Sequence, residues 1–184
     1  MHSSVPTGEA PVGTREGACA PQFQLHSYGL AMSTIALPLP KPPENLSSGE
    51  VLLRFANIVA GDSERGLVPY YHFRILDAEG TDVGHINFRV GDNAHVQLCA
   101  GHIGYEVQES FRGHGYALKA CRALAPFVRV FYSSVIITSD PDNHASLRTI
   151  ERLGASFIDE IEVPPHDPQY QRGSRRKKRY RWMP

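Results

Sequence analysis

A glycine-rich turn, Phe-Arg-Gly-His-Gly-Tyr-Ala at residues 111–117, is the stretch of the sequence best suited to chemistry. It follows an alternating apolar run at 102–107 and precedes a helical pattern. The first N–H groups of a helix have no internal partner, and the helix dipole adds positive potential there, so such a turn favours phosphate oxygens. Glycine lets the backbone approach a ligand closely and adopt positive φ. The candidate phosphate-binding residues are Arg112, Gly113, His114, Gly115, Tyr116 and Ala117.

A second polar segment, Asp-Pro-Asp-Asn-His-Ala-Ser at residues 140–146, follows the apolar run 135–138. The apolar run predicts a buried strand. Asp142 or Asn143 is a good N-cap for a helix over 143–153, and Gly154 is a good helix stop. The order is therefore strand, turn, helix, glycine and strand.

The two segments together resemble the GNAT superfamily of N-acetyltransferases. Arg112-x-x-Gly115-x-Ala117 is similar to the pyrophosphate-binding signature of that superfamily, and Asn143-x-x-Ser146 is similar to the opening of its later helix. The resemblance covers roughly residues 70–163. It implies an α+β fold with a mixed, mostly antiparallel central sheet flanked by helices.

The resemblance also implies acetyl-CoA as co-substrate and assigns roles to residues of this chain. The pyrophosphate would bind the N–H groups of 112–117, and the pantetheine would pair with the exposed strand edge at 106–108. An N–H near Val107 would polarise the thioester carbonyl. Asn143 and Ser146 would contact the pantetheine or the thiolate side.

The residues expected to act in acid–base catalysis are Glu106, His102 and Ser146. Direct attack on a thioester needs a neutral amine, so a carboxylate or imidazole must take its proton. Glu106 and His102 share a strand face because side chains alternate. Each also has a structural interpretation, Glu106 as a solvent-facing strand residue and His102 as a packing histidine. The helix tyrosine that protonates the thiolate in many family members is absent at 148–151, which leaves Ser146 or water for this role.

The sequence says least about the acceptor. In the GNAT fold the acceptor pocket is built by N-terminal segments, here 24–71, and Tyr70, Tyr71 and His72 are the expected substrate-binding residues. Their aromatic edges suit a small amine or a peptide terminus. Seven Lys/Arg and no acid lie in 172–181, so the other 12 basic residues (19 − 7) face 19 acidic ones and the remainder carries −7 (12 − 19). This charge favours a cationic amine.

Composition indicates a cytoplasmic protein. The three cysteines lack paired spacing, which argues for a reducing compartment. The sequence shows neither an apolar run of membrane-spanning length nor a signal peptide. His72, His85, His95 and His102 fall on successive predicted strands, but no metal-ligand spacing is present, so no metal is expected.

Three regions are expected along the chain. Residues 1–22 are poor in large apolar side chains and predict a disordered tail, and 23–48 predict an irregular, proline-rich lead-in. Residues 49–184 form the GNAT-like domain and include the basic segment 172–181. Strands are predicted at 51–59, 70–76, 83–90, within 96–107, at 135–138, 155–163 and 179–182, and helices at 117–131 and 143–153. The segment 77–80 predicts a hairpin turn, Pro126 a kink or end in the first helix, and 164–168 a loop.

Two other function classes stay open beside the enzyme. One is a catalytically silent module that binds acyl-CoA. The other is a nucleic-acid-binding protein acting through the basic segment 172–181, which is the weaker alternative because no RNA-binding motif accompanies it. Membrane partners are not expected, and the chain could pair as a homodimer.

Overall fold

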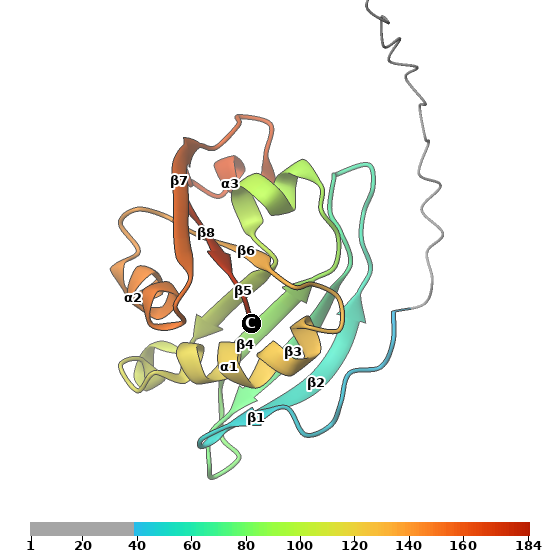
Figure 1. Ribbon diagram of the computed structural model, residues 1–184, viewed down its shortest axis with the longest axis vertical. Coiled ribbons are helices and arrows are strands. Elements are labelled where there is room, and N and C mark those ends of the chain that lie inside the picture. Colours follow the sequence, from blue (N-terminus) through green and yellow to red (C-terminus); the bar gives the residue numbers. More distant parts are fainter. Residues whose placement is uncertain (1–38) are drawn as a thin grey trace, which may run out of the picture. The chain divides into compact units, whose positions relative to one another are not determined.

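A five-stranded antiparallel sheet is the larger of the two sheets in the computed structural model, which describes residues 39–184 (Figure 1). The tail predicted at 1–22 and most of the lead-in at 23–48 lie outside the described residues. The strands follow one another in the sheet in sequence order: β1 (Ser47–Ser48), β2 (Val51–Val59), β3 (Tyr70–Leu76), β4 (Asp82–Arg89) and β5 (Ile103–Val107). The predictions for 51–59, 70–76 and 83–90 are confirmed.

The turn between β3 and β4 is the predicted hairpin turn. The carboxylate of Asp77 accepts hydrogen bonds from the N–H groups of Glu79 and Thr81, at 3.1 and 2.7 Å. Gly80 takes φ +80°, a value that glycine adopts without steric cost. The turn fixes the register of the two strands, which places Tyr70 opposite Arg89 and His72 opposite Asn87.

The remaining strands form a separate three-stranded sheet in the order β6 (Val135–Ser139), β8 (Arg176–Trp182), β7 (Ser156–Glu162). The sequence analysis expected a single central sheet. Among the described residues, the one backbone hydrogen bond that joins the two sheets at β5 and β6 runs from His102 N–H to Ile136 O, at 2.7 Å. The strands diverge beyond it, so β5 keeps an open edge.

The helix α1 (Tyr116–Val128) lies across the first sheet (Figure 1). The ring of Phe127, on α1, packs edge-on against the ring of Tyr71, with centroids 4.9 Å apart. Phe73 and Phe88 also pack against Phe127 and complete this aromatic core. Because side chains alternate along a strand, the opposite face of the sheet carries the polar residues. Pro126 lies inside the last turn, and the helix ends at Val128 rather than at the predicted 131.

The other helices are short. They are η1 (His95–Ala100, a π-helix), η2 (Glu109–Phe111, a 3-10 helix), α2 (His144–Arg152) and α3 (Pro168–Gln171). The strand predicted within 96–107 therefore begins only at Ile103, and His95 lies on η1 rather than on a strand. The predicted loop at 164–168 ends in α3. Within residues 39–184, no helix is both long and apolar enough to cross a membrane.

Candidate active site

A pocket of about 470 Å³ lies where the open edge of β5, the turn before α1 and the first turns of α2 come together. Nine residues predicted for the site line it: Glu106, Val107, Arg112, Gly113, Gly115, Tyr116, Ala117, Asn143 and Ser146. These residues come from two segments that are separated in the sequence. The fold thus brings the glycine turn and the Asn-x-x-Ser segment to one cavity.

The turn at 112–115 leaves the start of α1 open toward the pocket. Gly113 and Gly115 have φ of +89° and +75°. Among the described residues, no side chain caps α1, and its first turn contains no acidic residue. The N–H groups of Tyr116, Ala117 and Leu118 consequently have no partner within the helix, since the first such bond is from Lys119 N–H to Gly115 O. This is an anion-binding arrangement of backbone donors.

The side chains of the turn point away from the N–H groups. Arg112 Nε donates to Val107 O at 3.2 Å, which ties the turn to the end of β5. His114 is exposed, and its Nδ1 lies 3.2 Å from Phe111 O. It lies beside the pocket without lining it. Lys119 of α1 contacts Glu50 and donates a hydrogen bond to His114 O, so it holds the turn in place.

Strand β5 offers backbone donors to the pocket. The N–H of Gln108 donates to Val83 O on β4, at 2.9 Å. Backbone groups alternate in direction along an antiparallel strand, so the N–H groups of Val107 and Tyr105 point away from β4, toward the open edge. The N–H of Val107 therefore has the direction expected of a donor to a thioester carbonyl.

The pocket lies at the edge of β5, where consecutive residues of the strand line it. Tyr105 and Glu106 are consecutive, so their side chains lie on opposite faces of the strand, yet both line the pocket. Glu106 is exposed and lies opposite His85 of β4 in the β-sheet register. Burial, and secondarily the neighbouring His72, lowers the pKa of His85. A neutral imidazole therefore stands beside the carboxylate.

Tyr105 is a site residue that the sequence analysis missed. Its hydroxyl lies 3.0 Å from Ser146 Oγ, and burial raises the pKa of the phenol. It therefore stays protonated at neutral pH. The tyrosine of related proteins was expected on the helix at 148–151, whereas Tyr105 comes from strand β5. Strand alternation at Tyr105 was the available signal, but its distance to Ser146 depends on the tertiary fold.

Asn143 and Ser146 hold the start of α2. The Asn143 side chain accepts from Ser146 N–H at 3.1 Å, which confirms Asn143 as the N-cap. The amide oxygen of Asn143 is therefore engaged in capping the helix. Ser146 keeps its hydroxyl directed at Tyr105.

His102 lies outside the pocket, although it was expected to act with Glu106. It is 1% exposed. Its Nδ1 accepts a hydrogen bond from Ile136 N–H at 3.0 Å, so Nε2 is the protonated nitrogen and donates to Asp92 at 3.1 Å. Burial lowers the pKa of His102. Both nitrogens serve the junction of the two sheets, which is the packing interpretation of this histidine.

The three residues expected to bind the acceptor separate into two groups. Tyr70 and His72 lie on the polar face of the sheet, away from α1. Tyr71 lies in the core with 0% exposure, donates to Pro40 O at 2.7 Å, and burial raises its pKa to about 12. It cannot contact a ligand on the polar face because its side chain is on the other side of β3.

The histidines considered for a metal site do not gather at one place. His72 and His85 are neighbours, with ring centroids 5.3 Å apart, whereas His95 contacts Asp167 and His102 contacts Asp92. Within the described range, no group of three or more His, Cys, Asp or Glu side chains is arranged to hold a metal ion. Cys99 and Cys121 are buried free thiols, and burial raises the pKa of each to about 12.

Much of the basic segment 172–181 is built into β8. Lys177 is buried and contacts Asp140 at 2.8 Å, Arg179 binds both carboxylate oxygens of Asp159, and Arg176 contacts Glu160. Opposite charges thus balance much of this strand. Its geometry is that of a central strand rather than of a free basic tail.

Comparison with known proteins places this geometry in a family. Residues 25–156, more than half of the chain, match the family model described as acetyltransferase (GNAT) domain. No curated protein matches the sequence. Among solved structures, the chain is similar to RimL, a ribosomal L7/L12 α-N-protein acetyltransferase, in its apo form (20% identity, 62% of this chain and 69% of that one, TM-score 0.48).

Two further solved structures are similar at the same level. One is the microcin C7 self-immunity acetyltransferase MccE in complex with acetyl-CoA and AMP (19% identity, 62% of this chain and 61% of that one, TM-score 0.47). The other is a GNAT-family acetyltransferase from Bacillus anthracis (23% identity, 61% and 65%, TM-score 0.47). The chain spans between 61 and 69% of the length of these three proteins. On the family match, the chain is a member of the GNAT acetyltransferase family.

Proposed function

We propose that the protein transfers the acetyl group of acetyl-CoA to a primary amine of a small molecule or peptide, acting in the cytoplasm. The observation that carries the proposal is the single pocket formed by the uncapped start of α1, the open edge of β5 and the Asn143–Ser146 turn. Backbone donors for phosphate, a backbone donor for a carbonyl and two titratable side chains converge there. Acyl transfer from a thioester to an amine needs these groups together.

We assign the diphosphate of acetyl-CoA to the N–H groups at 113–118, and the pantetheine to the open edge of β5. The positive end of the α1 dipole favours the negative phosphates. The N–H of Val107 would donate to the thioester oxygen and stabilise the negative charge that develops there. Ser146 and Asn143 would lie on the thiol side.

Glu106 is the group we assign to deprotonate the amine. The amine nitrogen attacks the carbonyl carbon, a C–N bond forms, the C–S bond breaks, and the ammonium proton leaves to Glu106, directly or through water. His85 stands next to Glu106 in the register and can receive the proton from it. We assign no proton transfer to His102, because both of its nitrogens are occupied away from the pocket.

Tyr105 is the group we assign to protonate the departing thiolate. Its hydroxyl lies on the face of β5 opposite Glu106, so acid and base approach the reacting carbon from two sides. Ser146 Oγ lies 3.0 Å from the phenol and can pass the proton or orient it. This arrangement supplies an acid although the α2 helix has no tyrosine at the usual place.

Calorimetric titration of acetyl-CoA into the protein tests the cofactor, and release of free thiol in an amine panel tests the reaction. We expect a Kd near the micromolar range, about −8 kcal/mol, and thiol release that depends on the amine. Binding without thiol release for any amine would favour the silent acyl-CoA-binding module. Absence of binding would contradict the proposal altogether.

A further inference from the structure

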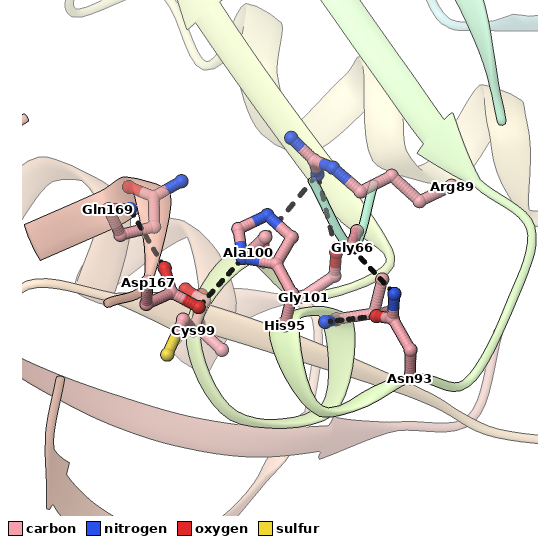
Figure 2. A network of polar contacts seen from close by, with 11 residues as sticks. Gly66, Arg89, Asn93, His95, Cys99, Ala100, Gly101, Asp167 and Gln169 are labelled. Carbon is pink, nitrogen blue, oxygen red and sulfur yellow. Dashed lines mark hydrogen bonds and ion pairs between the residues drawn. The ribbon is translucent and has the colours of Figure 1, made fainter. Parts of the chain in front are cut away.

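Arg89, near the end of β4, is a cation on the polar face of the sheet without a carboxylate partner in the described chain. Its Nη1 donates to the backbone carbonyls of Ala100 and Gly101, at 3.4 and 3.2 Å, as Figure 2 shows. Burial lowers the pKa of Arg89, which means that its charge is partly removed from water. A desolvated charge is costly unless an opposite charge compensates it.

Other arginines of the sheets have this compensation. Arg74 binds both oxygens of Asp82, and Arg179 binds both oxygens of Asp159. Within residues 39–184, no carboxylate lies within 4.0 Å of Arg89, and a second guanidinium, that of Arg172, lowers the pKa of Arg89 further. The two carbonyls occupy Nη1 and leave Nε and Nη2 of the planar fork for another acceptor.

The guanidinium of Arg89 lies over Gly104, two residues before the group that we assign as the base. A Cβ placed on Gly104 would lie 3.0 Å from Nη1 of Arg89, so the guanidinium covers Gly104 and glycine is needed there to make room. Gly104 and Glu106 are two residues apart on β5 and therefore face the same side, about 7 Å apart. Tyr70 lies opposite Arg89 on β3 and borders the same area.

We infer that Arg89 binds a carboxylate of the acceptor, which makes the acceptor a small amino acid that can span from Gly104 to Glu106 on one face of β5, about 7 Å along the strand. The inference rests on the proposed function for the amine end, at Glu106. Arg–carboxylate pairs form two parallel hydrogen bonds, so Arg89 would select the acceptor by geometry as well as by charge. Arg172 adds positive potential at the same end.

The charges near Arg89 point to a different acceptor from the cationic amine that the net charge of −7 outside the basic segment favoured. Charges separated by more than about 8 Å are largely screened at physiological salt. The groups within that distance of the acceptor thus outweigh the sum over the chain. An acceptor with both an ammonium and a carboxylate fits Glu106 at one end and Arg89 at the other.

The test compares two ligands that differ only in charge, 5-aminopentanoate and its amide, 5-aminopentanamide. Calorimetry measures the binding of each to the protein saturated with CoA, so turnover is not required. We expect the acid to bind at least about tenfold more tightly than the amide, because a hydrogen-bonded charge pair contributes that much or more. Arg89→Gln should remove this preference while retaining binding of the amide.

Arg54→Gln is the matched control. Arg54 is exposed, lies on the same face in register with Arg74, and is distant from Gly104 in the sheet order. It should keep the tenfold preference. Melting curves for both variants verify that the fold is retained.

Two results would overturn the inference: equal binding of acid and amide to the wild type, including undetectable binding of both, or a preference that survives Arg89→Gln. Failure of the proposed function has a different signature. It appears as an absence of acetyl-CoA binding, or as an absence of thiol release with every amine. Acetyl-CoA binding and amine-dependent thiol release without a preference for acids would leave the function intact and remove only the role of Arg89.

Discussion

The hydroxyl of Tyr105 on β5 lies 3.0 Å from the hydroxyl of Ser146 on α2, so two segments about 40 residues apart meet at a pair of proton-carrying groups. The contact bridges the two sides of the pocket. Burial keeps the phenol protonated by raising its pKa. The phenol therefore stays in its O–H form, which can donate a hydrogen bond to the departing thiolate and stabilise its charge while the C–S bond breaks.

Replacement of Tyr105 by Phe should lower kcat by about 100-fold or more, because general acid catalysis typically contributes about 10²–10⁴-fold. The affinity for acetyl-CoA should change little, since the ring stays in place. Stopped-flow measurement of thiol release gives kcat, and calorimetry gives the affinity. If the pair acts as a unit, Ser146→Ala and the double variant will lose no more than Tyr105→Phe alone. Additive losses would assign the two hydroxyls separate roles.

Replacement of Gly115 by Glu should abolish acetyl-CoA binding. The carboxylate would lie at the open start of α1, where it repels phosphate and occupies its donors. The substitution also costs about 1–2 kcal/mol of stability, because Gly115 has φ +75°.

Gly154→Glu controls for that strain. Gly154 has φ +77°, open space around it, and a place outside the pocket. This variant should lose similar stability but bind acetyl-CoA normally in calorimetry. Normal binding by Gly115→Glu would move the phosphate site elsewhere.

Replacement of Glu106 by Gln should lower kcat/KM by about 100-fold or more at neutral pH and by much less at alkaline pH. The reason is that an amine that is already neutral in solution needs no base. The pH–rate profile of both proteins measures the difference. Glu109→Gln serves as the control, because Glu109 is also exposed and near β5 but does not line the pocket. A loss that is the same at every pH would assign Glu106 a binding role instead.

The lowered pKa of His102 predicts that the stability of the protein depends on pH. Burial lowers its pKa in the folded protein, so the unfolded chain takes up a proton first, near the ordinary value of about 6.5. The free energy of unfolding should therefore fall as pH drops below that value, and the loss should be complete below the folded pKa. Denaturant unfolding at pH 5 to 8 measures this slope.

His102→Gln should remove part of the slope and cost about 1–3 kcal/mol at pH 7, since Ile136 N–H and Asp92 lose a well-placed partner. His85 also has a lowered pKa, so His85→Gln removes its own share and separates the two contributions. A slope unchanged in His102→Gln would show that the junction tolerates the charged imidazole.

The elements that were predictable are those with local signals. Asp77 and Gly80 mark their turn, Asn143 caps its helix, and alternation or helical spacing gives β2, β3, β4 and α1. The π-helix at His95–Ala100 was not predictable, because its apolar residues alternate as in a strand while its partners, such as Asp167, are far away in the sequence. The end of α1 was predicted three residues too late, at 131 instead of Val128, and Pro126 lies within the last turn without marking the end.

The candidate site divides in the same way. The glycine turn and Asn143–Ser146 were recognisable from spacing alone, and both line the pocket. The functions of single side chains were not, because they depend on which face of a strand is covered. His102 and Glu106 share a strand parity, yet the chain bends at the junction with β6, so one is buried and the other exposed.

The position of β8 between β6 and β7 has a consequence for how the protein reaches its fold. Val135 pairs with Trp182, and Ser156 pairs with Arg181, whereas β6 and β7 do not pair with each other. The edges of β6 and β7 therefore stay unpaired until β8, which is synthesised later, is available to pair with them. Contacts so distant in sequence slow folding, and open edges invite pairing with other chains. We expect the second sheet to form last, and with it the position of α2 beside the pocket.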